Sequence, residues 1–83
     1  MKKTIYWSVE KNGHAEYYFD KNKMFNDWGN TKHLLENIDR YGLHFYSLET
    51  EITDDLILFM INGRFSHNLL PDYRNAKMIY ADQ

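Results

Sequence analysis

The chain contains no cysteine among its 83 residues, and only one proline and four glycines. Without thiols it can form neither disulfides nor the thiolate zinc sites that stabilise many small domains. A separate second domain needs roughly 50 residues or more of its own, so we expect residues 1–83 to form a single domain. Three sources of stability then remain, which are aromatic packing, self-association as a homo-oligomer, and contact with a partner.

A long hydrophobic run is also missing. The longest uninterrupted apolar run is residues 56–61, whereas a helix that crosses a bilayer needs about 20 residues. Lys2 and Lys3 resemble the basic start of a signal peptide, but Ser8 and Glu10 interrupt the apolar region that should follow. We therefore expect no membrane association and a cytoplasmic location.

The chain has no large excess of one charge, since its net charge is −2 at pH 7. Such a balance argues against a protein that holds nucleic acid mainly by neutralising phosphates. The charges are unevenly distributed, because residues 41–63 contain no lysine or arginine. The same stretch contains four carboxylates with no local counter-charge, here called the acidic segment: Glu49, Glu51, Asp54 and Asp55.

Patterns for catalysis and metal binding are absent from the sequence. No two of the four histidines, His14, His33, His44 and His67, have the helical spacing of a metal site. A meeting of His44 and His67 across neighbouring strands is the one arrangement that would join two of them. The chain has no glycine-rich phosphate loop, no nucleophile elbow and no calcium-binding loop. We predict that the protein is not an enzyme and binds no metal or cofactor.

Aromatic side chains are abundant, with two tryptophans, seven tyrosines and five phenylalanines. Each buries about 150–250 Å² when it enters a core. Many of them lie in two alternating runs, residues 4–10 and 14–20, which flank Asn12-Gly13. Asn-Gly between alternating runs is the strongest short-range signal of a β-hairpin.

Two registers of this hairpin are conceivable. A two-residue loop would set Val9 opposite Glu16 and mix apolar with charged side chains on each face. A three-residue loop, with Gly13 in the left-handed conformation, sets Val9 opposite Ala15 and separates the faces. We predict the three-residue loop, because a buried sheet face selects the segregated register. The apolar face then holds Ile5, Trp7, Val9, Ala15, Tyr17 and Phe19, and the polar face holds Thr4, Tyr6, Ser8, Glu10, His14, Glu16, Tyr18 and Asp20.

Two helical segments are predicted after the hairpin. Met24, Phe25 and Trp28 indicate a short helical turn, with Asn22 as its cap and Gly29 as its end. The main helix is predicted over residues 31–41, where Leu34, Leu35, Ile38 and Tyr41 share one face. Asn30 or Thr31 would cap this helix and Gly42 would end it. Whether the two segments form one kinked helix stays open.

The remaining residues are predicted to return to the sheet. Residues 43–52 read as a strand, and we favour a further strand over residues 56–61, joined to residues 64–66 by a hairpin turn at Asn62-Gly63. Periodicity does not separate a strand from a helix in such an apolar run, and Thr53-Asp54-Asp55 would also suit a helix start. Leu70-Pro71-Asp72 marks a turn or a helix start, and residues 77–80 form a last strand or the end of a helix. The predicted fold is α+β, an antiparallel sheet in ββαββ order with the main helix on one face.

Function enters as a hypothesis. We expect a non-catalytic protein-binding module, with candidate contact residues Tyr6 and Tyr18 on the outer face of the hairpin. The acidic segment would dock on a basic surface of the partner, such as the nucleic-acid groove of another protein. The chain is rich in residues that AT-rich codons encode, which suggests a phage or mobile element and a role as inhibitor or regulator of a host protein. The alternative is a single-stranded nucleic-acid binder that uses sheet aromatics and the lysines Lys2, Lys3, Lys11 and Lys21.

Overall fold

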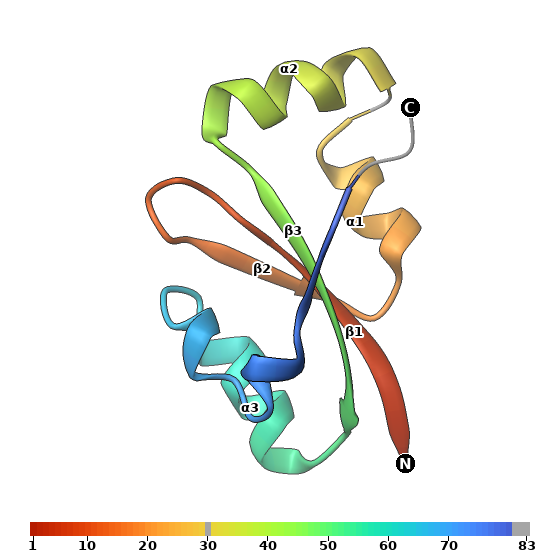
Figure 1. The fold of residues 1–83 in the computed structure, drawn as a ribbon, viewed down its shortest axis with the longest axis vertical. Helices are drawn as coiled ribbons and strands as arrows, with labels where there is room; N and C mark the ends of the chain where they lie inside the picture. Colours follow the sequence, from red (N-terminus) through yellow and green to blue (C-terminus); the bar gives the residue numbers. More distant parts are fainter. Residues whose placement is uncertain (30, 81–83) are drawn as a thin grey trace.

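The fold is an antiparallel sheet with helices around it (Figure 1). The computed structural model describes residues 1–29 and 31–80. Their elements are, in chain order, β1 (Lys2–Val9), β2 (Ala15–Tyr18), α1 (Lys21–Asp27), α2 (Thr31–Tyr41), β3 (His44–Glu51), α3 (Asp54–Asn62), the short 3₁₀ helices η1 (His67–Leu69) and η2 (Tyr73–Asn75), and β4 (Lys77–Ile79). The predicted α+β class, with a four-stranded antiparallel sheet and the main helix packed on one face, is confirmed.

The strands lie in the order β2-β1-β3-β4, so that β1 pairs on both of its edges. Trp7 lies opposite Tyr17 and Val9 opposite Ala15, which confirms the register of the three-residue loop. The N–H of Gly13 donates to the carbonyl of Glu10 at 2.8 Å, and Gly13 has a φ of 91°. This left-handed conformation favours glycine, because glycine has no Cβ. At this position it gives the loop a twist that matches the twist of the two strands.

The first core lies on the face of the sheet that the hairpin pattern predicts to be apolar. Its buried residues are Ile5, Trp7, Val9, Ala15, Leu48, Leu56 and Leu70. Trp7 is completely buried and stacks on Tyr46, with ring centroids 5.4 Å apart. The cover on this side comes from α3 and from the segment around η1 and η2, which supply Leu56 and Leu70.

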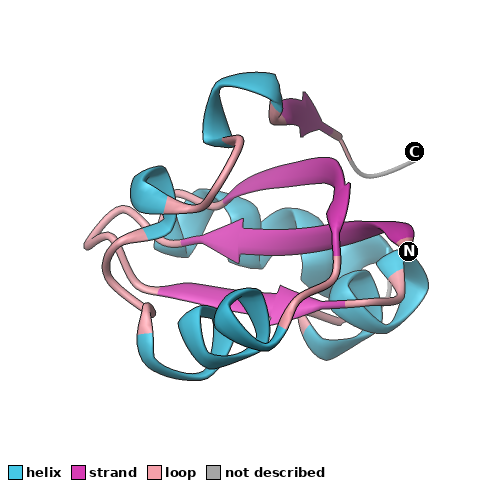
Figure 2. Cartoon of the chain, turned by 90° about the horizontal axis from the view of Figure 1, so that it is seen from below, coloured by secondary structure: helices cyan, strands magenta, loops and turns pink. Residues whose placement is uncertain are grey.

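A second core covers the opposite face of the sheet. Its buried residues are Met24, Leu34, Leu43 and Phe45, so α1 and α2 provide the cover. Ser8, predicted to lie on the polar face of the hairpin, is only 1% exposed because α1 and α2 cover this face, and its hydroxyl accepts a hydrogen bond from Trp28 Nε1 at 3.0 Å. The sheet is therefore covered on both sides, and its strands run between helices (Figure 2).

The prediction of a strand over residues 56–61 is wrong, because this run lies in α3. Thr53 caps the helix, since its Oγ1 accepts from the N–H of Leu56 at 3.1 Å, and acidic residues in the first turn complement the helix dipole. The Asn62-Gly63 turn into residues 64–66 is likewise not a hairpin. Gly63 ends α3 instead, and its N–H donates to the carbonyl of Phe59 at 2.6 Å. The fourth strand is β4, which confirms the strand alternative for residues 77–80.

The helical predictions for residues 21–42 hold with one correction. The helix over residues 31–41 is confirmed as α2, and α1 is a separate helix. The cap of α1 is Asp20, whose Oδ1 accepts from the N–H of Asn22 at 2.9 Å, rather than Asn22 itself. Gly29 and Gly42 follow the two helices with φ values of 114° and 60°. The predicted capping by Asn30 or by the Thr31 side chain lies outside the described residues.

Candidate protein-binding surface

A groove lies between the edge strand β2 and the helix α3. It has a volume of about 260 Å³ and is lined by Glu16, Tyr17, Phe19, Ile57, Met60, Ile61 and Arg64. The helix is anchored on the first core by Leu56. Ile57, Met60 and Ile61 of α3 therefore lie beside the side chains at the edge of the sheet. We call this feature the β2–α3 groove.

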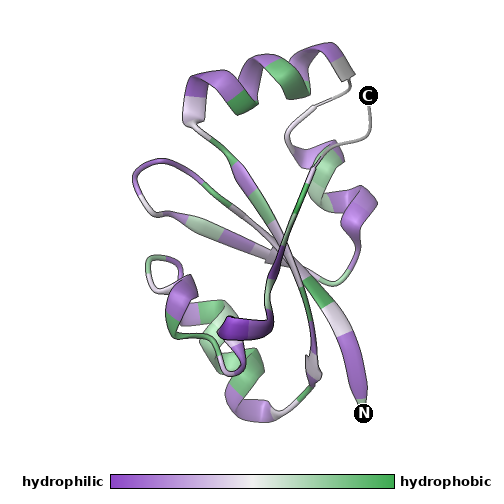
Figure 3. Cartoon of the chain, in the orientation of Figure 1, coloured by the Kyte–Doolittle hydropathy of each residue, from purple (hydrophilic) through white to green (hydrophobic). Residues whose placement is uncertain are grey.

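The walls of the groove are apolar and open to solvent. Phe19 is 52% exposed and Ile61 is 59% exposed. Two apolar side chains outside the lining of the groove, Leu58 on α3 and Phe65 just beyond it, are exposed to 56% and 68%. Figure 3 shows that hydrophobic residues recur along α3. Exposed apolar side chains gathered at one place are typical of a contact surface.

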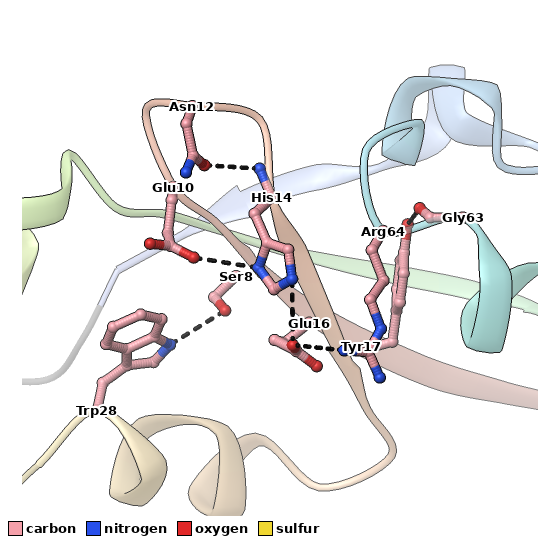
Figure 4. A network of polar contacts seen from close by, with 9 residues as sticks. All are labelled: Ser8, Glu10, Asn12, His14, Glu16, Tyr17, Trp28, Gly63 and Arg64. Atoms are coloured by element: carbon pink, nitrogen blue, oxygen red, sulfur yellow. Dashed lines mark hydrogen bonds and ion pairs between the residues drawn. The ribbon is translucent and has the colours of Figure 1, made fainter.

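One end of the groove is closed by the segment that follows α3. The carbonyl of Arg64 accepts from the N–H of Ala15 at 2.6 Å, and the hydroxyl of Tyr17 donates to the carbonyl of Gly63 at 2.8 Å (Figure 4). Burial raises the pKa of Tyr17 to about 12. The neutral phenol donates this hydrogen bond at physiological pH. These bonds fix the loop against the edge of the sheet.

A chain of polar contacts supports the same end. The guanidinium of Arg64 lies 3.3 Å from the carboxylate of Glu16. His14 lies between two carboxylates, with Nδ1 3.1 Å from Glu10 and Nε2 3.4 Å from Glu16 (Figure 4). The imidazole also meets the ring of Phe65 edge-on, at a centroid distance of 5.2 Å. The hairpin therefore holds both the charged and the aromatic residues of the loop.

Tyr6 and Tyr18, the predicted contact residues of the hairpin, lie elsewhere. They form the expected cross-strand pair, but the pair is half-buried against the second core. Burial and a hydrogen bond to Asp27 raise the pKa of Tyr18 above its usual value. Of the two possibilities for this pair, an exposed binding surface or a face covered by a helix, the structure shows the covered face, and a binding role for these two tyrosines stays a prediction.

The structure divides the acidic segment between two elements. Glu49 and Glu51 lie in β3, where Glu51 pairs with Lys2 across the ladder. A carboxylate oxygen of Glu51 lies 2.7 Å from the amino group of Met1, and this contact lowers the pKa of Glu51. The expectation of no local counter-charge is wrong for Glu51, because β1 brings cations from the other end of the sequence.

Asp54 and Asp55 occupy the exposed first turn of α3, where neither carboxylate has an ion-pair partner among the described residues. They lie on the same helix as Leu58 and Ile61. Asp54 lies three residues before the groove residue Ile57 and so on the same side of α3, whereas Asp55 lies on another side of the helix.

Sequence reasoning missed the groove itself. Assigning residues 56–61 to a strand concealed the helical spacing that sets Ile57 and Ile61 side by side, one turn apart. The signal that could have revealed it is the capping sequence at Thr53, followed by two acids. Phe19 was expected on the buried face of the hairpin, but β2 ends at Tyr18 and Phe19 is exposed.

The histidines do not assemble into a site. His67 accepts a hydrogen bond from Trp7 at 3.1 Å, whereas His44 is exposed in β3 opposite Val9. Within residues 1–29 and 31–80, no three histidine or carboxylate side chains gather as a metal site would require. None of the helices in the described part of the chain is both long enough and apolar enough to span a bilayer. Comparisons with protein families, curated proteins and solved structures found no match to the chain.

Proposed function

We propose that the chain is a non-catalytic protein-binding module that inhibits or regulates its partner, and that the β2–α3 groove is its contact surface. The observation that carries the proposal is the exposure of Phe19 and Ile61, each more than half exposed, on opposite walls of one groove. Burying such large apolar side chains against a partner supplies binding free energy, and it does so best in a pocket that excludes water.

The carboxylates in the first turn of α3 favour a partner with a basic surface. Asp54 and Asp55 extend from α3 without an ion-pair partner among the described residues. Charge complementarity of this kind speeds encounter and selects among partners more than it adds affinity. The narrower form of the proposal, an inhibitor encoded by a phage or mobile element that acts on a cytoplasmic host protein, still depends on the composition of the chain.

Nucleic-acid binding on the sheet is the weaker candidate. Base stacking requires exposed rings, but Trp7 is completely buried and Tyr6 is half-buried under α1 and α2. Lys2 lies at the start of β1 and Lys11 in the loop beyond its far end, so these two lysines do not belong to one basic stripe. A gel-shift assay at low and high salt tests this candidate, and retention of single-stranded DNA by the chain would favour it.

The test of the proposed function is capture of the partner with matched variants. The tagged chain is incubated with a lysate of its native host, and bound proteins and nucleic acid are both quantified. Phe19→Ser and Ile61→Ser should each reduce the recovered partner at least tenfold. Leu35→Ser is the control, because Leu35 is 44% exposed on α2, away from the groove. Circular dichroism and thermal unfolding verify that the variants fold. Equal recovery by all three variants would overturn the assignment of the groove.

A further inference from the structure

The β2–α3 groove has two features of a site for an extended polypeptide, which are a free strand edge and an apolar wall beside it. We propose that a segment of the partner adds to the edge of β2 as a new strand. This inference rests on the proposed function. Alternate side chains of this segment would lie in the groove, and a lysine or arginine would reach the first turn of α3.

The free edge follows from the hydrogen-bond pattern of the hairpin. The N–H of Glu10 donates to the carbonyl of His14, and in an antiparallel pair the bonded residues alternate along each strand. The N–H and C=O groups of Ala15 and Tyr17 therefore point away from β1. The outward N–H of Ala15 is taken by the carbonyl of Arg64 at 2.6 Å. Within the described part of the chain, the outward groups of Tyr17 make no backbone hydrogen bond.

An unpaired N–H and C=O on a sheet edge are a template for another strand. Side chains of a strand point alternately to the two faces of the sheet. Every second side chain of the added segment would therefore point toward α3, where Ile57 and Ile61 form the wall. This arrangement gives specificity for an alternating apolar sequence.

The charges along the groove favour a particular charge on the added segment. At one end the positive charge of Arg64 is balanced by Glu16, 3.3 Å away. At the other end Asp54 lies three residues before Ile57, about 4.5 Å along the helix axis, and its charge is not balanced by an ion pair among the described residues. The complement is an extended segment with a basic residue beyond its apolar positions.

A second copy of the chain fits the same edge poorly. Two copies of β2 paired symmetrically about Tyr17 would set Phe19 of each copy opposite Ala15 of the other. The outward N–H of Ala15 already bonds to Arg64, whose loop covers that part of the edge. This symmetric pairing of two copies is therefore disfavoured, and the occupant that we propose is a segment of a different protein.

The probes are three synthetic ten-residue peptides, titrated into the full ¹⁵N-labelled chain. The first alternates leucine with threonine and ends in two lysines, and the second has the same composition with leucines at helical spacing. The third replaces the lysines of the first by glutamates. The first peptide should shift the amide signals of residues 57–64 and slow hydrogen exchange at Tyr17. The other two should bind at least tenfold more weakly.

Variants connect this binding to the named residues. Ile61→Ser should weaken binding of the first peptide at least tenfold. The double variant Asp54→Asn with Asp55→Asn should also weaken binding of this peptide and remove most of the salt dependence of its affinity. Leu35→Ser should leave its affinity unchanged.

Strand addition is overturned if the helically spaced peptide binds the groove as tightly, or if Tyr17 stays unprotected in the complex. Equal binding of the glutamate peptide would contradict the basic character of the segment. Concentration-dependent shifts at the same amides without peptide would assign the edge to a second copy instead. In each of these cases the capture experiment still decides the proposed function separately, because it depends on the groove and not on the conformation of the bound segment.

Discussion

The indole N–H of Trp7 donates to Nδ1 of His67 at 3.1 Å, across 60 residues of sequence. Trp7 is completely buried, and the imidazole packs edge-on against Tyr73 with ring centroids 5.4 Å apart. An imidazole accepts a hydrogen bond only through an unprotonated nitrogen. The contact therefore requires neutral His67, and burial lowers the pKa of His67 accordingly.

The first prediction concerns stability in mild acid. A histidine whose pKa is lowered by folding contributes stability that is fully present above the pKa of the unfolded chain, about 6.5. That contribution is lost as the pH falls from there through the folded pKa, because the unfolded chain binds the proton first. Urea unfolding between pH 8 and pH 5 should show this loss. His67→Gln keeps an acceptor for Trp7 without titrating, so its curve should be flatter. Parallel curves for both proteins would contradict the assignment.

The second prediction concerns alkaline pH and Tyr17. Because folding raises its pKa to about 12, its contribution to stability is complete below about pH 10 and is lost as the pH rises toward 12. Tyr17→Phe should abolish the tyrosinate absorbance that appears in this range from Tyr17. At neutral pH it should cost about 1 kcal/mol, since the carbonyl of Gly63 loses its donor. Spectrophotometric titration and urea unfolding measure the two effects, and no change in either would contradict the hydrogen bond.

The third prediction concerns the glycine that ends α3. A Cβ at Gly63 would lie 2.8 Å from the carbonyl oxygen and from a ring carbon of Phe59. Gly63→Ala should therefore lower the free energy of unfolding by about 1–3 kcal/mol, as overpacking does, and displace the loop at the groove. Gly13→Asn is the comparison in which only the backbone is strained, because open space surrounds Gly13 and its left-handed φ of 91° favours glycine. Thermal unfolding should show the larger loss for Gly63→Ala.

The fourth prediction concerns Ser8, which is 1% exposed in the second core. Ser8→Ala removes the acceptor of Trp28 Nε1, at 3.0 Å, and should cost about 1–2 kcal/mol because a half-buried N–H loses its partner. A double-mutant cycle with Trp28→Phe measures the interaction, since the second substitution should recover part of the loss. Strictly additive costs would show that the two side chains are independent.

The hairpin was predictable because all of its information is local. The Asn12-Gly13 turn and the alternation on both sides of it agree, and together they specify the register from Trp7 to Tyr17. The α2 helix was predictable for a similar reason, since its apolar spacing and the glycine at its end occur within residues 31–42. In both cases one period and one boundary signal support the same structure.

The α3 helix was not predictable from periodicity, because an apolar run has no polar positions to reveal its period. Its capping by Thr53 is the only local evidence, and that evidence was outweighed by Asn62-Gly63. The groove is further removed from the sequence, since it joins Phe19 to Ile61 through packing of α3 on the sheet. The same holds for the cations of β1 that face Glu51, because sequence patterns do not report which strands pair.

Trp7 and Ser8 are neighbours in β1, and they point into different cores. The strand also pairs on both edges, with β2 close in sequence and with β3 from Lys2–Glu51 to Val9–His44. Both cores therefore depend on the same strand, and opening either one exposes a face of β1. We expect the two half-cores to melt in one cooperative transition, with the slowest amide exchange in β1, although either core alone is too small to impose such behaviour.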